Sequence, residues 1–219
     1  GLRTASESLP LGYLYEDGTL GGLDVDLAAA LADELGLKVS YVAVSDAVSA
    51  ANTSCDIVMG VSSLEQGLTI AGTYAESSVA FFGRGEGIAQ VTDLNGKSVG
   101  VQDGSASQVA LSRTGLMMGQ TTYADLNSAF EALASGQVDY VLCDAYAGAY
   151  LSLQYRSVSF EGCLDTPIPT GIGVSSDNPE LAGQVAQALE TLRSDGVLGL
   201  VRSPWVGELP TLGAERSEE

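Results

Sequence analysis

The sequence predicts an α/β fold, because short apolar segments typical of strands alternate along the chain with amphipathic segments typical of helices. The clearest helical pattern covers residues 23–35, where a leucine recurs at every fourth position and Gly36 follows as a stop signal. The clearest strand patterns are the apolar runs at residues 56–61 and 138–143. These observations favour a mixed fold in which helices cover sheets.

The remaining elements follow from the same patterns. Strands are expected where apolar residues run between turn residues, at 2–6, 39–44, 79–82, 98–101, 121–123 and 171–174. Helices are expected where apolar residues recur with helical spacing, at 46–52, 104–112, 125–135, 145–153 and 179–194. The last helix carries two start signals, since Asn178 is a favourable N-cap and Pro179 suits the first helical position.

The order of these elements predicts two lobes. The chain completes one α/β section, and a second section of the same kind follows it. Extended segments near residues 79–84 and 170–174 would carry the chain into the second section and back. We therefore expect a discontinuous lobe 1 formed by residues 1–83 and 171–219, and a lobe 2 formed by residues 84–170.

The composition excludes several classes of function. The 219 residues carry 28 acidic and 9 basic side chains, a net charge of −19 that disfavours nucleic acids and anionic membranes as partners. The chain contains no histidine, which removes Ser-His-Asp catalysis and histidine-based zinc sites. No CxxC motif is present either, so we expect neither a metal nor a cofactor.

The three cysteines are Cys55, Cys143 and Cys163. In an oxidising compartment they would allow one disulfide and one free thiol. The candidate pair is Cys143 with Cys163, because both fall in the second predicted lobe. Three buried free thiols are the alternative, since unpaired cysteines behave as small apolar residues.

Four groups of motifs resemble, in the right order, the polar-amino-acid solute-binding proteins of ABC importers. The first is similar to that family's G-F-D-V-D-L, the second to D-L-K-G-K-x-V-G-V-Q, the third to A-L-x-x-G-x-V-D, and the last to N-P-E-L, L-x-x-D-G and W-x-G. In this chain they read GLDVDL at 22–27, DLNGKSVGVQ at 93–102, ALASGQVD at 132–139, and NPEL, LRSDG and WVG at 178–181, 192–196 and 205–207.

The resemblance covers residues 2–207 and implies a type II periplasmic-binding-protein fold, in which two hinge strands join two lobes. It implies an extracytoplasmic solute-binding protein that closes by hinge bending on a small polar ligand, amino-acid-like or an amine, and delivers it to a membrane permease. It also implies a monomer, either tethered by an N-terminal lipid or free outside the membrane.

Two candidate ligand contacts lie in the second predicted lobe. Gly104 and Ser105 follow a strand and open a helix, whose free N–H groups suit a carboxylate. The resemblance assigns this turn to the ligand α-carboxylate, whereas an ordinary loop–helix junction is the alternative. Asp144 ends another strand, where the resemblance assigns it to a ligand ammonium. Asp144 also suits a helix N-cap, and both roles can hold together.

The loop after residues 56–61 departs from the family pattern. Met59, Gly60 and Ser62 are candidate contacts there, but Gly67 or Gln66 stands where the family has an arginine that clamps the ligand carboxylate. Three interpretations follow. The ligand is not a standard α-amino acid, or Ser105 and backbone N–H groups alone hold its carboxylate, or binding has been lost.

The N-terminal loop is shorter than in the family, and Leu11 replaces an aromatic residue. Glu7 is expected to face the ligand, and Tyr13 could serve as a substitute wall or pack on the core. A site with Glu7 and Asp144 favours a small or cationic ligand.

Two other functions share this fold. A dehydratase-like enzyme would use Glu7 or Asp144 as a general acid or base, although a lone carboxylate more often pairs with an amine. A ligand-sensing or partner-binding module is the second alternative, and the missing arginine favours it.

Overall fold

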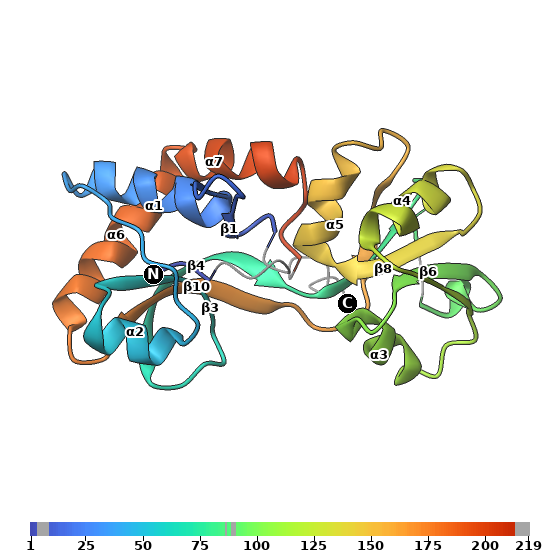
Figure 1. Ribbon diagram of the computed structural model, residues 1–219, viewed down its shortest axis with the longest axis horizontal. Helices are drawn as coiled ribbons and strands as arrows, with labels where there is room; N and C mark the ends of the chain where they lie inside the picture. The colour runs from blue at the N-terminus through green and yellow to red at the C-terminus, as the bar shows by residue number, and fades with distance from the viewer. Residues whose placement is uncertain (4–8, 86, 89–90, 213–219) are drawn as a thin grey trace. The chain divides into compact units, whose positions relative to one another are not determined.

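The structure is a computed structural model that describes residues 1–3, 9–85, 87–88 and 91–212. It divides into two compact units (Figure 1). Unit 1 comprises Gly1–Glu76 and Ile168–Glu208, and unit 2 comprises Ser77–Pro167 with the segment that begins at Leu209. Both units combine helices with a sheet, so the predicted α/β class is confirmed.

The sheet of unit 1 has the strand order β3-β10-β4, and β10 runs antiparallel to β3. The first residues of the chain extend this sheet, because Met59 N–H donates to Gly1 O at 2.9 Å while Val44 N–H donates to Leu2 O at 2.9 Å. Leu2 and Ala43 form a parallel bridge. The strands of this unit are β1 (Tyr13–Leu14), β2 (Leu20–Gly21), β3 (Ile57–Ser62), β4 (Leu68–Ser77) and β10 (Ile168–Ser175).

Helices α1 and α6 pack on one face of this sheet and α2 on the other, while α7 packs against α1 and α6 (Figure 1). Leu23, Leu27 and Leu31 are almost fully buried, which explains the leucine spacing of the first helix. The helix bounds are α1 (Leu23–Glu34), α2 (Ala47–Thr53), α6 (Pro179–Ser194) and α7 (Val197–Val206).

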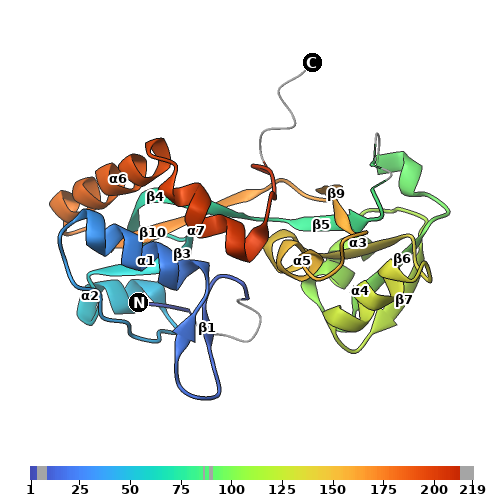
Figure 2. The same cartoon turned by 90° about the horizontal axis from the view of Figure 1, so that it is seen from above.

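The sheet of unit 2 has the order β7-β6-β8-β5-β9 (Figure 2). Its strands are β5 (Val79–Gly83), β6 (Ser98–Gln102), β7 (Gly119–Tyr123), β8 (Tyr140–Asp144) and β9 (Ser159–Cys163). Because β6 and β8 are parallel, their carboxyl ends lie at the same edge of the sheet. Its helices are η2 (Val91–Leu94), a 3₁₀ turn, with α3 (Ala106–Ser112), α4 (Leu126–Ala134) and α5 (Ala145–Ser152).

The boundaries between the units differ from the predicted lobe boundaries. Residues 79–83 were expected in lobe 1, yet β5 belongs to unit 2 because it pairs with β8 on one side and β9 on the other. Residues 168–170 belong to unit 1 because Thr170 pairs with Ser62. The chain therefore enters unit 2 before β5.

The predicted disulfide between Cys143 and Cys163 is wrong, because neither cysteine is in a disulfide. Both residues pair with Ala80, Cys143 from β8 and Cys163 from β9. Two strand spacings of about 4.8 Å each place their Cα atoms roughly 9–10 Å apart. That separation exceeds the roughly 7 Å limit for a disulfide.

No helix in the described part of the chain is long and apolar enough to span a membrane.

Candidate functional site

Ser105 is the N-cap of α3 and follows the carboxyl end of β6, where the sequence predicted a strand followed by a helix. Its Oγ accepts the N–H of Gln108 at 3.2 Å, and the Gln108 Oε1 accepts the N–H of Gly104 at 2.9 Å. Gly104 has φ +70°, a conformation that favours glycine in this turn. The cap uses a Ser105 lone pair, so the hydroxyl proton can be donated to a ligand. Ala106 and Ser107 begin the helix, where N–H groups lack intrahelical acceptors.

Asp144 is the last residue of β8 and the N-cap of α5. Its Oδ1 accepts the N–H groups of Tyr146 and Ala147, both at 3.0 Å, so the predicted N-cap role is confirmed. Within the described ranges, Oδ2 forms no hydrogen bond, and the residue is solvent exposed. Asp144 therefore combines a fixed orientation with one oxygen that is available to a ligand.

A second carboxylate lies beside Asp144. Val79 pairs with Asp144 across the sheet, and its N–H donates to Asp165 Oδ1 at 2.8 Å. Ser78 Oγ donates to the same oxygen at 2.7 Å. Protein atoms around the Asp144 carboxylate displace water, and this desolvation raises its pKa. The negative charge of Asp165 also raises this pKa, whereas the hydrogen bonds from Tyr146 and Ala147 lower it. The local potential is negative, which favours a cationic partner.

Met59 and Gly60 form a bulge in β3. They stand together opposite Ile172, because Val58 pairs with Gly173 and Val61 pairs with Gly171. The side chain of Met59 is 1% exposed and belongs to the core. Gly60 has φ +72°, so the bulge requires a residue that tolerates the left-handed region. Met59 is therefore almost inaccessible to a ligand, and its N–H already donates to Gly1 O.

The bulge is tied to a buried carboxylate that the sequence analysis did not nominate. The N–H of Gly60 donates to the Tyr74 hydroxyl at 2.8 Å, and this hydroxyl donates a short hydrogen bond to Asp24 Oδ1. Asp24 is 1% exposed, and burial raises its pKa to about 6 while the Tyr74 hydrogen bond opposes the shift. The only feature of the sequence that pointed to Asp24 was its position in the GLDVDL motif.

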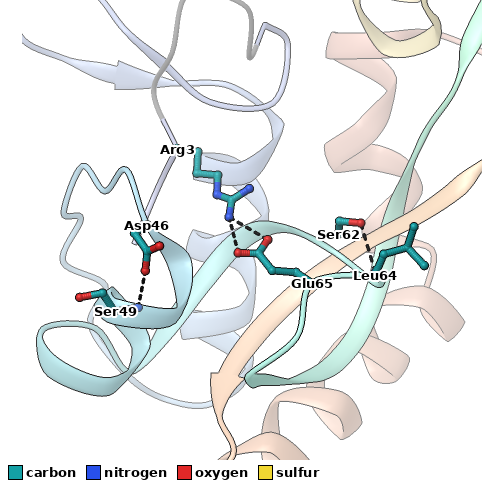
Figure 3. Close-up of polar contacts among 6 residues, drawn as sticks. All are labelled: Arg3, Asp46, Ser49, Ser62, Leu64 and Glu65. Carbon is teal, nitrogen blue, oxygen red and sulfur yellow. Dashed lines mark hydrogen bonds and ion pairs between the residues drawn. The ribbon is translucent and has the colours of Figure 1, made fainter.

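The loop after β3 contains no arginine, but Arg3 reaches it (Figure 3). One guanidinium nitrogen of Arg3 donates to both carboxylate oxygens of Glu65, each at 2.8 Å. Ser62 ends β3 just before this loop, and its Oγ accepts the N–H of Leu64 at 3.2 Å. Arg3 follows Gly1 and Leu2, which run alongside β3. Sequence reasoning missed Arg3 because it did not place the first residues of the chain beside this strand.

The remaining predicted ligand contacts are Glu7 and Tyr13. Glu7 lies outside the described residues. Tyr13 is partly exposed in β1, and its ring packs edge-on against Tyr15 with a centroid distance of 5.0 Å.

Unit 1 also contains a cavity of about 500 Å³. It is lined mainly by apolar side chains of α1, residues 35–42 and α6. Met59 is the one predicted site residue among its lining residues, so this cavity is distinct from the strand ends that carry the other candidates.

Comparisons with known proteins agree with the motifs. The family model for bacterial extracellular solute-binding proteins, family 3, matches residues 2–208. The L-cystine-binding protein TcyJ of Escherichia coli (strain K12) is 26% identical over 209 residues, which cover 90% of this chain and 79% of the relative. Membrane-bound lytic murein transglycosylase F of Yersinia pestis (strain Pestoides F) is 26% identical over 230 residues, covering 95% of this chain and 46% of that protein.

The fold has close structural counterparts. A polar amino acid ABC uptake transporter substrate binding protein from Streptococcus thermophilus matches with a TM-score of 0.86 and 21% identity, covering 100% of this chain and 91% of that chain. At this identity the likeness shows the fold, which is the predicted type II periplasmic-binding-protein fold. The family match spans nearly the whole chain, and the chain therefore belongs to the bacterial extracellular solute-binding proteins of family 3.

Proposed function

We propose that this chain is the solute-binding component of an ABC importer and that it binds an α-amino acid with an uncharged polar or cationic side chain. The observation that carries the proposal is the geometry of Asp144, which caps α5 through Oδ1 and leaves Oδ2 available. The matching family and the amino-acid-binding proteins among its relatives support the same ligand class.

The ammonium group is assigned to Asp144. An ammonium is a strong donor to a carboxylate, and the cap holds this carboxylate in one orientation before the ligand arrives. The nearby Asp165 adds negative charge, which disfavours a ligand with an anionic side chain.

The carboxylate group is assigned to the turn at Gly104 and Ser105. The Ser105 hydroxyl and the free N–H groups of the first turn of α3 are suitable donors. Ser62 and the backbone of Gly60, in unit 1, are assigned to the remaining polar contacts. We further propose that the two units close on the ligand, as the family resemblance implies.

The same proposal covers the setting of the protein. We propose a monomer outside the cytoplasmic membrane that delivers its ligand to a permease, with an N-terminal lipid as its tether. We also propose that the chain itself is no enzyme. The transglycosylase relative favours a second possibility, a ligand-binding part of a larger enzyme, because this chain matches 46% of that protein.

The test is isothermal titration with L-cystine, L-arginine, L-glutamine, L-glutamate and cadaverine. We expect at least one of the first three to bind and L-glutamate to bind most weakly. Binding of L-glutamate alone would contradict the assigned charge preference, and binding of none of the four amino acids would contradict the ligand class.

A matched pair of variants tests the role of Asp144. Asp144→Asn keeps a good N-cap but removes the charge, and Asp125→Asn makes the same change at the cap of α4. We expect Asp144→Asn to weaken amino acid binding by at least about 30-fold, the effect of losing one partner of a charge pair. Asp125→Asn should bind as the wild type does. Equal affinities of the two variants would remove Asp144 from the site.

A further inference from the structure

The bulge in β3 has an unusual hydrogen-bond partner. In a regular ladder the N–H of Gly60 would face β10, but Gly60 lies in the bulge opposite Ile172. A buried N–H without an acceptor is costly, and the Tyr74 hydroxyl of β4 accepts this one at 2.8 Å. The conformation of Gly60 therefore depends on a side chain 14 residues further along the chain.

The orientation of the Tyr74 hydroxyl depends in turn on Asp24. A tyrosine hydroxyl has a single proton, and Tyr74 donates it to Asp24 Oδ1. This leaves the oxygen lone pairs for the N–H of Gly60. A negatively charged acceptor strengthens the first hydrogen bond and polarises the hydroxyl, so the second bond becomes stronger as well.

Asp24 has few other interactions. Its backbone N–H donates to Leu11 O at 2.8 Å, and its place in the first turn of α1 favours a negative charge. Among the described residues no basic side chain pairs with Asp24, and Tyr74 of β4 is the titratable group bonded to it. The neighbouring Asp26 accepts instead from Trp205 of α7 at 2.7 Å.

Space around the carboxylate is also restricted. A Cβ atom added at Gly60 would lie 3.1 Å from Asp24 Oδ2, and one added at Gly12 would lie 3.8 Å from the same oxygen. The carboxylate thus fits against the backbone of β3. A change in its charge or position would act directly on the bulge.

We propose that Asp24 and Tyr74 are positioning residues for ligand binding, which hold the Met59–Gly60 bulge so that β3 presents Gly60 and Ser62 to the ligand. The proposal rests on the proposed function, because it needs the carboxyl end of β3 to contact the ligand. It assigns a functional role to a buried pair that touches no ligand itself.

The first experiment does not need a ligand. The amide signal of Gly60 is followed by NMR in ¹⁵N-labelled protein between pH 5 and pH 7.5. In the wild type we expect its chemical shift to titrate with a midpoint near the Asp24 pKa of about 6. In Asp24→Asn the titration should disappear, because an amide accepts the Tyr74 proton without titrating.

The second experiment measures L-arginine binding by the same variants. At pH 7.5 we expect Asp24→Asn to bind about 5-fold more weakly, since a neutral acceptor replaces a charged one. Between pH 7.5 and pH 5.5 the wild-type affinity should fall toward that of Asp24→Asn. Tyr74→Phe should bind weakly throughout this range. If L-arginine does not bind the wild type, the amino acid with the strongest signal in the titration panel replaces it.

Tyr41→Phe is the matched control. The Tyr41 hydroxyl donates to Val25 O at 3.0 Å, so its loss removes a partly buried hydrogen bond of unit 1 that involves neither Asp24, Tyr74 nor Gly60. This variant should keep the wild-type affinity and pH profile.

The outcomes separate the two proposals. Absence of any amino acid binding by the wild type would contradict the proposed function, while the Gly60 titration would still report on the bulge. If the wild type binds, and Asp24→Asn and Tyr74→Phe share its affinity and pH profile, the positioning role is overturned.

Discussion

Arg3 and Glu65 lie 62 residues apart in the sequence, yet one nitrogen of the Arg3 guanidinium contacts both oxygens of the Glu65 carboxylate at 2.8 Å. The contact joins the end of the first extended segment to the loop that follows β3 (Figure 3). A positive charge therefore stands beside the loop in which the family pattern has an arginine and this chain has none.

Arg3 is expected to contribute to carboxylate binding. Arg3→Gln should weaken binding of an α-amino acid by about 10-fold and leave binding of cadaverine, which lacks a carboxylate, unchanged. Because the pair is partly exposed, the free energy of unfolding should change by less than about 1 kcal/mol.

The control for this variant is Arg193→Gln, which removes an exposed pair with Glu190 on α6 and a hydrogen bond to Thr73 O at 2.8 Å. This variant should bind both the α-amino acid and cadaverine with the wild-type affinity. Equal amino acid affinities of the two variants would show that the Arg3–Glu65 pair has a structural role only. Isothermal titration provides both measurements.

The cysteines are expected to differ in reactivity. Cys143 is 4% exposed, and burial raises the pKa of its thiol well above the usual value, so N-ethylmaleimide should leave it unmodified in the native protein. Cys55 and Cys163 are partly exposed and should react faster. In denaturant, mass spectrometry should find three modified cysteines without any reductant. A single modified cysteine under those conditions would mean that a disulfide exists.

Asp24 should make stability depend on pH. Its pKa is raised from 3.8 to about 6, so the folded state holds a proton that the unfolded state has released between these values. The stability it contributes is therefore present below about pH 4 and is lost as the pH rises to about 6. Two pKa units correspond to a change on the order of 3 kcal/mol.

Urea unfolding of the wild type and Asp24→Asn between pH 4 and pH 7.5 measures this effect. As the pH rises, the wild type should lose stability relative to Asp24→Asn, so the free energy of unfolding of the variant should increase relative to that of the wild type. A constant difference would mean that Asp24 does not titrate in this range. With the positioning role proposed above, the ionised carboxylate would lower stability while it improves binding.

Gly148 is expected to be essential for packing in unit 2. A Cβ atom there would lie 2.2 Å from a ring carbon of Phe82 and 2.7 Å from the sulfur of Cys143. Gly148→Ala should destabilise the protein by about 1–3 kcal/mol. Gly183→Ala in α6 meets nothing within 4 Å and should stabilise it by roughly 0.5–1 kcal/mol. Thermal unfolding of the two variants should shift in opposite directions.

Local features of the chain were predictable from sequence where neighbouring residues decide them. Asn178 caps α6 through its side chain, and Pro179 occupies the first position of that helix. Asp144 caps α5 as predicted. The α/β alternation and the motif order also pointed to the family that the comparisons show.

Other features depend on contacts between distant residues. The 10-residue strand β4 was not predicted. It lies at the edge of the sheet, and pairing with β10, rather than an alternation of polar and apolar residues in its own sequence, makes it a strand. The predicted disulfide was wrong because sequence places two cysteines in one unit but does not give the strand order between them.

The sequence by itself determined the fold class, the helix caps and the two polar strand ends at Ser105 and Asp144, because each depends on residues close together in the chain. Only the tertiary structure decided that Tyr74 links Gly60 to Asp24 and that Arg3 reaches Glu65. The first contact joins helix α1 to two strands that β10 separates, and the second joins the first residues of the chain to the loop after β3. Both depend on how distant parts of the chain pack around the whole sheet, which no local stretch of sequence specifies.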